Sequence, residues 1–91
     1  MTDDNTSETL LEFPCDFPVK VMGRDEPAFR AAVAGIFEKH VGAVDASQFR
    51  ESKSRNANFI SLTVTIRATS QAQLDGIYTD LSANDDVLVA L

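Results

Sequence analysis

The strictest alternation of hydrophobic and polar residues in the chain runs from Phe59 to Ala68. Every even-numbered position there is apolar, and the odd-numbered positions are polar apart from Phe59 itself. Because successive side chains of a strand point to opposite faces, this pattern predicts a strand with one covered and one open face. Weaker patterns predict three more strands, at 17–23, at 44–54 on a sheet edge, and at 87–91.

Two other segments carry apolar residues at spacings of three and four, which is typical of amphipathic helices. Asp25, with Pro27 after it, predicts the start of the first helix, and Gly42 predicts its C-cap. Ser70 and Gln73 match a capping box that opens the second helix. The expected core comprises Phe29, Val33 and Ile36 of the first helix, Leu62, Val64 and Ile66 of the strict strand, and Leu74, Ile77 and Leu81 of the second helix.

The predicted order is strand, helix, strand, strand, helix, strand, within 91 residues. This order in so short a chain is typical of the ferredoxin-like βαββαβ fold, an α+β two-layer sandwich. It predicts a four-stranded antiparallel sheet with both helices on one face. Residues 10–91 form one domain on this interpretation, and residues 1–9 are predicted to be a disordered acidic tail.

The charge is concentrated at the start of the chain. The whole chain carries 14 acids and 8 bases, a net charge of -6. Residues 1–16 hold five of the acids and none of the bases, so the remaining 75 residues have a net charge of only -1. Such a chain is a poor partner for nucleic acid or an anionic membrane. The acidic N-terminus does not resemble a signal peptide, and with a single cysteine we expect a cytoplasmic location.

Few residues offer catalytic or metal-binding chemistry. His40 is the only histidine, and we expect it to interact with the carbonyls at the end of the first helix. Cys15 lies between two prolines and beside the acidic Asp16, and we expect no reactive role for it. The pairs Asp3–Asp4 and Asp85–Asp86 are expected to be solvated. The sequence therefore predicts no enzyme, no cofactor and no metal site.

The open side of the sheet is the predicted interaction face. A protein partner or a second copy is the expected occupant, with a small metabolite as an alternative. Two phenylalanines could also stack RNA bases, and residues 50–67 have a local charge of +3. The acidic tail and the absence of the sequence signature of RNA-recognition motifs argue against RNA. The residues assigned to this face are Lys20, Met22, Phe49, Lys53, Phe59, Thr63 and Arg67.

Several segments resemble a family of small bacterial proteins typified by YbeD. They are the opening at 13–23, which includes Lys20-Val21-Met22-Gly23, the strand at 61–69, and the second helix with the terminal Val-Leu-Val-Ala-Leu. The resemblance covers residues 11–91. It implies a ferredoxin-like fold similar to regulatory ACT domains, and it supplies no catalytic residues.

On this resemblance we expect a non-enzymatic regulatory or adaptor module that acts through protein–protein contact. A link to lipoate metabolism is implied only by the family's name. An amino-acid-binding ACT-like domain and a weak RNA-binding module are the alternatives.

Overall fold

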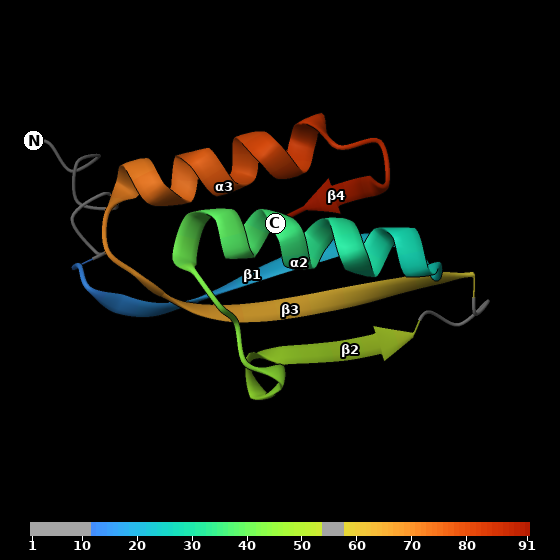
Figure 1. The fold of residues 1–91 in the computed structure, drawn as a ribbon, viewed down its shortest axis with the longest axis horizontal. Helices are drawn as coiled ribbons and strands as arrows, with labels where there is room; N and C mark the ends of the chain where they lie inside the picture. The colour runs from blue at the N-terminus through green and yellow to red at the C-terminus, as the bar shows by residue number, and fades with distance from the viewer. Residues whose placement is uncertain (1–11, 54–57) are drawn as a thin grey trace, which may run out of the picture.

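The computed structural model describes residues 12–53 and 58–91. The predicted tail at 1–9, and residues 54–57 of the turn before the strict strand, lie outside these ranges. Figure 1 shows the chain running back and forth across one sheet. The elements, in chain order, are β1 (Cys15–Arg24), α2 (Pro27–Val41), the short 3-10 helix η1 (Ala46–Gln48), β2 (Phe49–Lys53), β3 (Phe59–Ala68), α3 (Gln71–Ala83) and β4 (Val87–Ala90).

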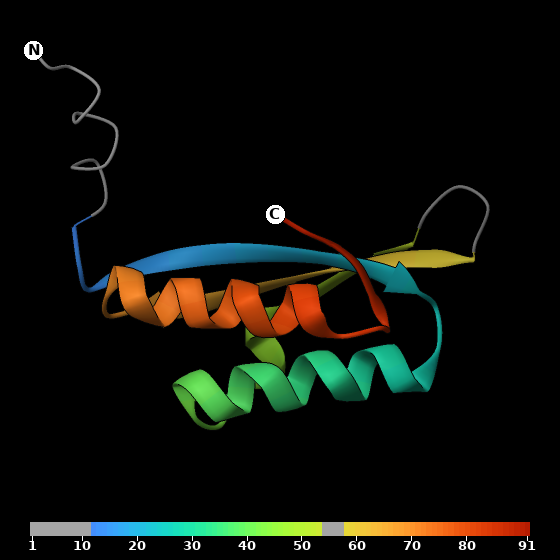
Figure 2. The ribbon, with the colours of Figure 1, turned by 90° about the horizontal axis from the view of Figure 1, so that it is seen from above.

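The four strands form one antiparallel sheet in the order β2-β3-β1-β4. The central pair, β1 and β3, is aligned over ten residues, from Cys15 opposite Ala68 to Arg24 opposite Phe59. Figure 2 shows both helices on one side of this sheet. The predicted ferredoxin-like α+β fold is therefore confirmed.

The N-cap of the first helix lies one residue later than predicted. Glu26, not Asp25, is the N-cap, and Pro27 occupies the first turn as expected. The carboxylate of Asp25 instead pairs with Arg30, at 2.8 Å. Gly42 ends the helix with a φ of +83°, which confirms the predicted C-cap. A residue with a side chain would be strained at that backbone angle, which explains why a glycine occupies this position.

The second helix has the expected cap residue but a different capping partner. The hydroxyl of Ser70 accepts a hydrogen bond from the amide of Gln73 at 3.1 Å. The side chain of Gln73 accepts from the amide of Thr69, at 2.9 Å, where a capping box would use Ser70. Both bonds satisfy backbone amides near the start of α3, which stabilises this helix end.

The core lies between the sheet and the two helices. Phe29, Val33 and Phe37 are the buried residues of α2, spaced four apart on a single stripe. Ile36, expected in the core, lies on the flank of that stripe and is only partly buried. The other predicted core positions are confirmed: Leu62, Val64 and Ile66 of β3, and Leu74, Ile77 and Leu81 of α3.

We expect Phe37→Ala to lower the free energy of unfolding by about 3–5 kcal/mol, because a buried ring leaves a large cavity. Ile36→Ala, next to it on the partly buried flank, should cost less than half as much. Urea unfolding followed by circular dichroism would compare the two midpoints. Equal losses would contradict the position of the buried stripe on α2.

Candidate functional site

One face of the sheet is left uncovered by the helices, and we call it the open face. Side chains of directly paired residues in an antiparallel sheet share a face. Lys20 is opposite Thr63, Met22 is opposite Ser61, and both pairs point away from the buried residues of β1 and β3. The predicted residues that the structure places on the open face are Lys20, Met22, Phe59, Thr63 and Arg67.

The predicted placement of Phe49 and Lys53 on the open face is wrong. Phe49 is opposite Val64 and packs against the core, and Lys53 is opposite Ile60. Their partners are buried beneath the helices, so both residues belong to the helix-covered face. The alternation along β2 was predicted with the correct period but assigned to the wrong faces. Neither side of this short strand is strongly apolar, so the period alone does not say which side is buried.

Residues that sequence reasoning missed take their place on the open face. Arg50 is opposite Thr63, and Ser52 is opposite Ser61. Arg24 ends β1 on this face. If Phe49 is taken as the buried residue of β2, the alternation places Arg50 and Ser52 on the opposite, open face. This signal in the sequence could have identified both residues.

The open face is positively charged, although the chain carries -6 overall. Among the residues that the structure describes, four bases on this face outnumber one acid, which is a local charge of +3. Arg67 lies 3.4 Å from the carboxylate of Asp16. These charged residues are Asp16, Lys20, Arg24, Arg50 and Arg67.

Apolar side chains lie among these charges. The guanidinium of Arg24 sits 5.8 Å from the centre of the Phe59 ring, within the range of a cation–π contact. Met22 is half-buried and is opposite Val89 of β4. The open face therefore combines a cationic surface with apolar anchors, a composition suited to contact with another macromolecule.

A second polar cluster joins the two helices. Nε2 of His40, near the end of α2, lies 2.7 Å from Oδ2 of Asp80 on α3, and Nζ of Lys39 lies 3.0 Å from the same oxygen. These two hydrogen bonds, with His40 the larger cause, hold the pKa of Asp80 below its ordinary value. His40 thus bonds to the opposite helix instead of the predicted helix-end carbonyls.

Gly76 of α3 allows this contact. A Cβ atom at that position would lie 2.9 Å from Cε1 of the His40 ring. The absence of a side chain at Gly76 therefore lets the imidazole lie close against α3. We call the contact of His40 and Lys39 with Asp80 the helix clamp, because it connects α2 to α3.

The remaining candidate residues are dispersed. Cys15 is half-buried and is opposite Ala68 at the end of the central strand pair. Asp86 follows Asn84 in the turn before β4, where its amide donates to the Asn84 side chain at 2.8 Å. Asp3 and Asp4 lie outside the described residues. Within 12–53 and 58–91, no three histidine, cysteine or acidic side chains cluster as metal ligands would.

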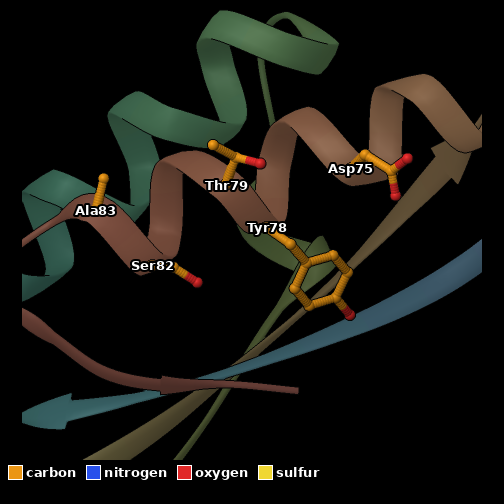
Figure 3. Close-up of a pocket in the computed structure, with 5 residues that line it drawn as sticks. All are labelled: Asp75, Tyr78, Thr79, Ser82 and Ala83. Atoms are coloured by element: carbon orange, nitrogen blue, oxygen red, sulfur yellow. The ribbon is translucent and has the colours of Figure 1, made fainter.

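A shallow groove runs along the flank of α3. Figure 3 shows Tyr78 leaning from this helix toward the sheet, with the other lining side chains around it. The Tyr78 hydroxyl donates to the backbone carbonyl of Leu91 at 2.8 Å, which ties the residue after β4 to α3. Burial raises the pKa of this phenol. The lining residues are Asp75, Tyr78, Thr79, Ser82 and Ala83.

Fold and surface together define a small ferredoxin-like α+β protein that leaves one basic sheet face bare. None of the helices in the described ranges is long and apolar enough to cross a membrane. The chain belongs to the family described as "Protein of unknown function (DUF493)", whose model matches residues 8–91. This is the family of YbeD, so the resemblance seen in the sequence is confirmed.

Relatives from several bacteria match over nearly their full length. A UPF0250 protein of Paraburkholderia phytofirmans is 42% identical over 87 residues, which cover 96% of this chain and 98% of the relative. The UPF0250 protein NE1487 of Nitrosomonas europaea is 40% identical, with 94% and 99% covered. The solution structure of protein HP0495 from H. pylori is similar in fold, with a TM-score of 0.62 at 20% identity and coverage of 89% and 85%.

The helix clamp predicts a specific dependence of stability on pH. The folded-state pKa of Asp80 lies below the ordinary 3.8, so its ionisation stabilises the fold above that value and ceases to do so as the pH falls through the folded-state pKa. We expect Asp80→Asn to lower the urea midpoint at about pH 7, and the difference from wild type to shrink toward about pH 2.

Asp75→Asn is the matched control on the same helix, because that carboxylate accepts from the neutral Gln71 side chain. A constant Asp80→Asn effect across the pH range would contradict the clamp.

Proposed function

We propose that this protein is a non-enzymatic regulatory or adaptor module of the cytoplasm that binds an acidic surface of a partner protein through its open face. The observation that carries the proposal is the +3 charge of this face in a chain of -6. Helices cover only the opposite side of the sheet. A cationic surface on an otherwise acidic protein favours one orientation toward an anionic partner and disfavours self-association through the same face.

Charged and apolar residues of the open face contribute differently to partner binding. Electrostatic complementarity mainly sets orientation and association rate, whereas buried aromatic and apolar anchors supply much of the affinity. Phe59 and Met22 are both half-buried on the open face, and Phe59 has Arg24 over its ring. An acidic protein surface with an apolar recess would complement this arrangement.

The other occupants weighed from the sequence have weaker support. RNA stacking required Phe49 and Phe59 on one face, and Phe49 packs against the core on the other side. A small metabolite is usually bound in an enclosed and mostly apolar cavity, whereas the groove on α3 is shallow and open. The link to lipoate metabolism rests on the family's name, and no residue of the open face is specific for that chemistry.

Two substitutions in β2 provide a matched test of the proposed face. Arg50→Gln and Lys53→Gln each remove one positive charge from the same strand, on opposite faces of the sheet. Once a partner is identified by affinity purification from the native host, we expect Arg50→Gln to weaken binding several-fold and to reduce its salt dependence. Lys53→Gln should bind like wild type. Equal effects, or co-purification of RNA alone, would overturn the proposal.

Removal of the aromatic anchor should separate binding from folding. We expect Phe59→Ala to weaken partner binding about 30-fold, as a hot-spot truncation of ~2 kcal/mol would. Its ring lies outside the core, so the urea midpoint should change little. Calorimetric titration and urea unfolding of the same variant would measure both. Loss of the fold with no separate loss of affinity would contradict an interface role for Phe59.

A further inference from the structure

The two edges of the sheet differ sharply in their chemistry. The outer strand β2 carries Arg50, Glu51 and Lys53 among its five residues, and Arg30 of α2 reaches across to bond both carboxylate oxygens of Glu51, at 3.2 and 2.8 Å. Charged side chains on an edge strand discourage pairing with another strand. The strand β4 at the other edge carries no charge at all.

The β4 edge also exposes apolar side chains. Leu88, Val89 and Leu91 are 53%, 43% and 64% exposed, and within the described ranges they are the large hydrophobic residues classed as exposed. Val89 is opposite Met22 and Leu91 is opposite Lys20, so these two side chains form an apolar strip where the open face meets this edge. An uncharged, apolar edge has no charged side chain to oppose pairing with another strand, although β4 is short and its pairing with β1 shifts register between Met22 and Gly23.

The backbone of this edge is directed outward for such pairing. Leu91 exchanges both backbone hydrogen bonds with Lys20 of β1, at 3.1 and 2.7 Å. In an antiparallel pair, residues that exchange both bonds alternate with residues whose amide and carbonyl face the other way. Ala90 is the neighbour of Leu91 in this alternation and is opposite Val21. Its amide and carbonyl therefore point to the outer edge of β4.

We propose that β4 pairs antiparallel with β4 of a second copy, which joins the two sheets into one of eight strands. A two-fold axis makes a strand antiparallel to its own copy, so an uncharged apolar strand meets the same uncharged apolar strand. The ends are also complementary in charge. Asp85 and Asp86 precede β4, and Lys20 lies opposite its far end at Leu91, so antiparallel pairing carries the acidic turn of each copy toward Lys20 of the other.

The surroundings of β4 suit this association. The groove on the flank of α3 includes the small side chain of Ser82, which Figure 3 shows on the same side of the helix as Tyr78. The hydrogen bond from Tyr78 to Leu91 holds the end of the strand in place before pairing. A pre-ordered strand loses less conformational entropy when it binds.

The inference does not rest on the proposed function: the dimer is measured without a partner protein, although Val89 lies opposite Met22 on the open face. Sedimentation equilibrium of wild type should show a concentration-dependent dimer. Val89→Lys places a charge on the apolar strip and should raise the dimer dissociation constant by at least about 30-fold. Ser52→Lys is the matched control, since it adds the same charge to the exposed side of β2, at the opposite edge. It should leave the dimer unchanged.

Two further measurements keep the test decisive if Val89→Lys unfolds. Ala90→Pro removes the outward amide donor while β1 keeps its partner Leu91, and it should also give a monomer. Hydrogen exchange of wild type should show the Ala90 amide slowing as protein concentration rises. A monomer at all concentrations, or a dimer in which Ala90 stays unprotected, would overturn the proposal.

Discussion

The pairing of β1 with β3 is the constraint on which the rest of the structure depends. Ten consecutive residue pairs align the alternation of both strands, so their apolar positions meet on one face and their polar positions on the other. A shift by one residue would expose the whole apolar set, so burial holds the register firmly. The helices then cover the apolar side, with the stripe of Phe29, Val33 and Phe37 packed against it.

The same register determines the character of the open face. Lys20, Arg24 and Arg67 alternate with buried residues of β1 and β3, so packing of the core forces them outward together. The chain thereby keeps a basic surface although its acids outnumber its bases. Fold stability and surface charge are coupled in this domain, because one alternation specifies both.

The two outer strands give the sheet unlike edges. At β2 the ion pair of Glu51 with Arg30 connects the strand to α2, and charged side chains discourage further pairing. At β4 the apolar strip and the outward backbone of Ala90 leave the sheet open to extension. If both proposals hold, a dimer would present two open faces side by side on one continuous sheet.

The sequence by itself determined the order of the four strands and two α-helices, the fold class and the faces of β1 and β3, because a strict period of two needs no further information. It predicted Gly42 and Ser70 as cap residues for the same local reason. It did not predict the 3-10 helix η1, which lies inside the strand expected at 44–54. Only the tertiary structure decided the faces of β2, where Phe49 turned inward because Val64 is its partner. It also brought His40 to Asp80, 40 residues apart, since helix packing sets such contacts and no local pattern encodes them.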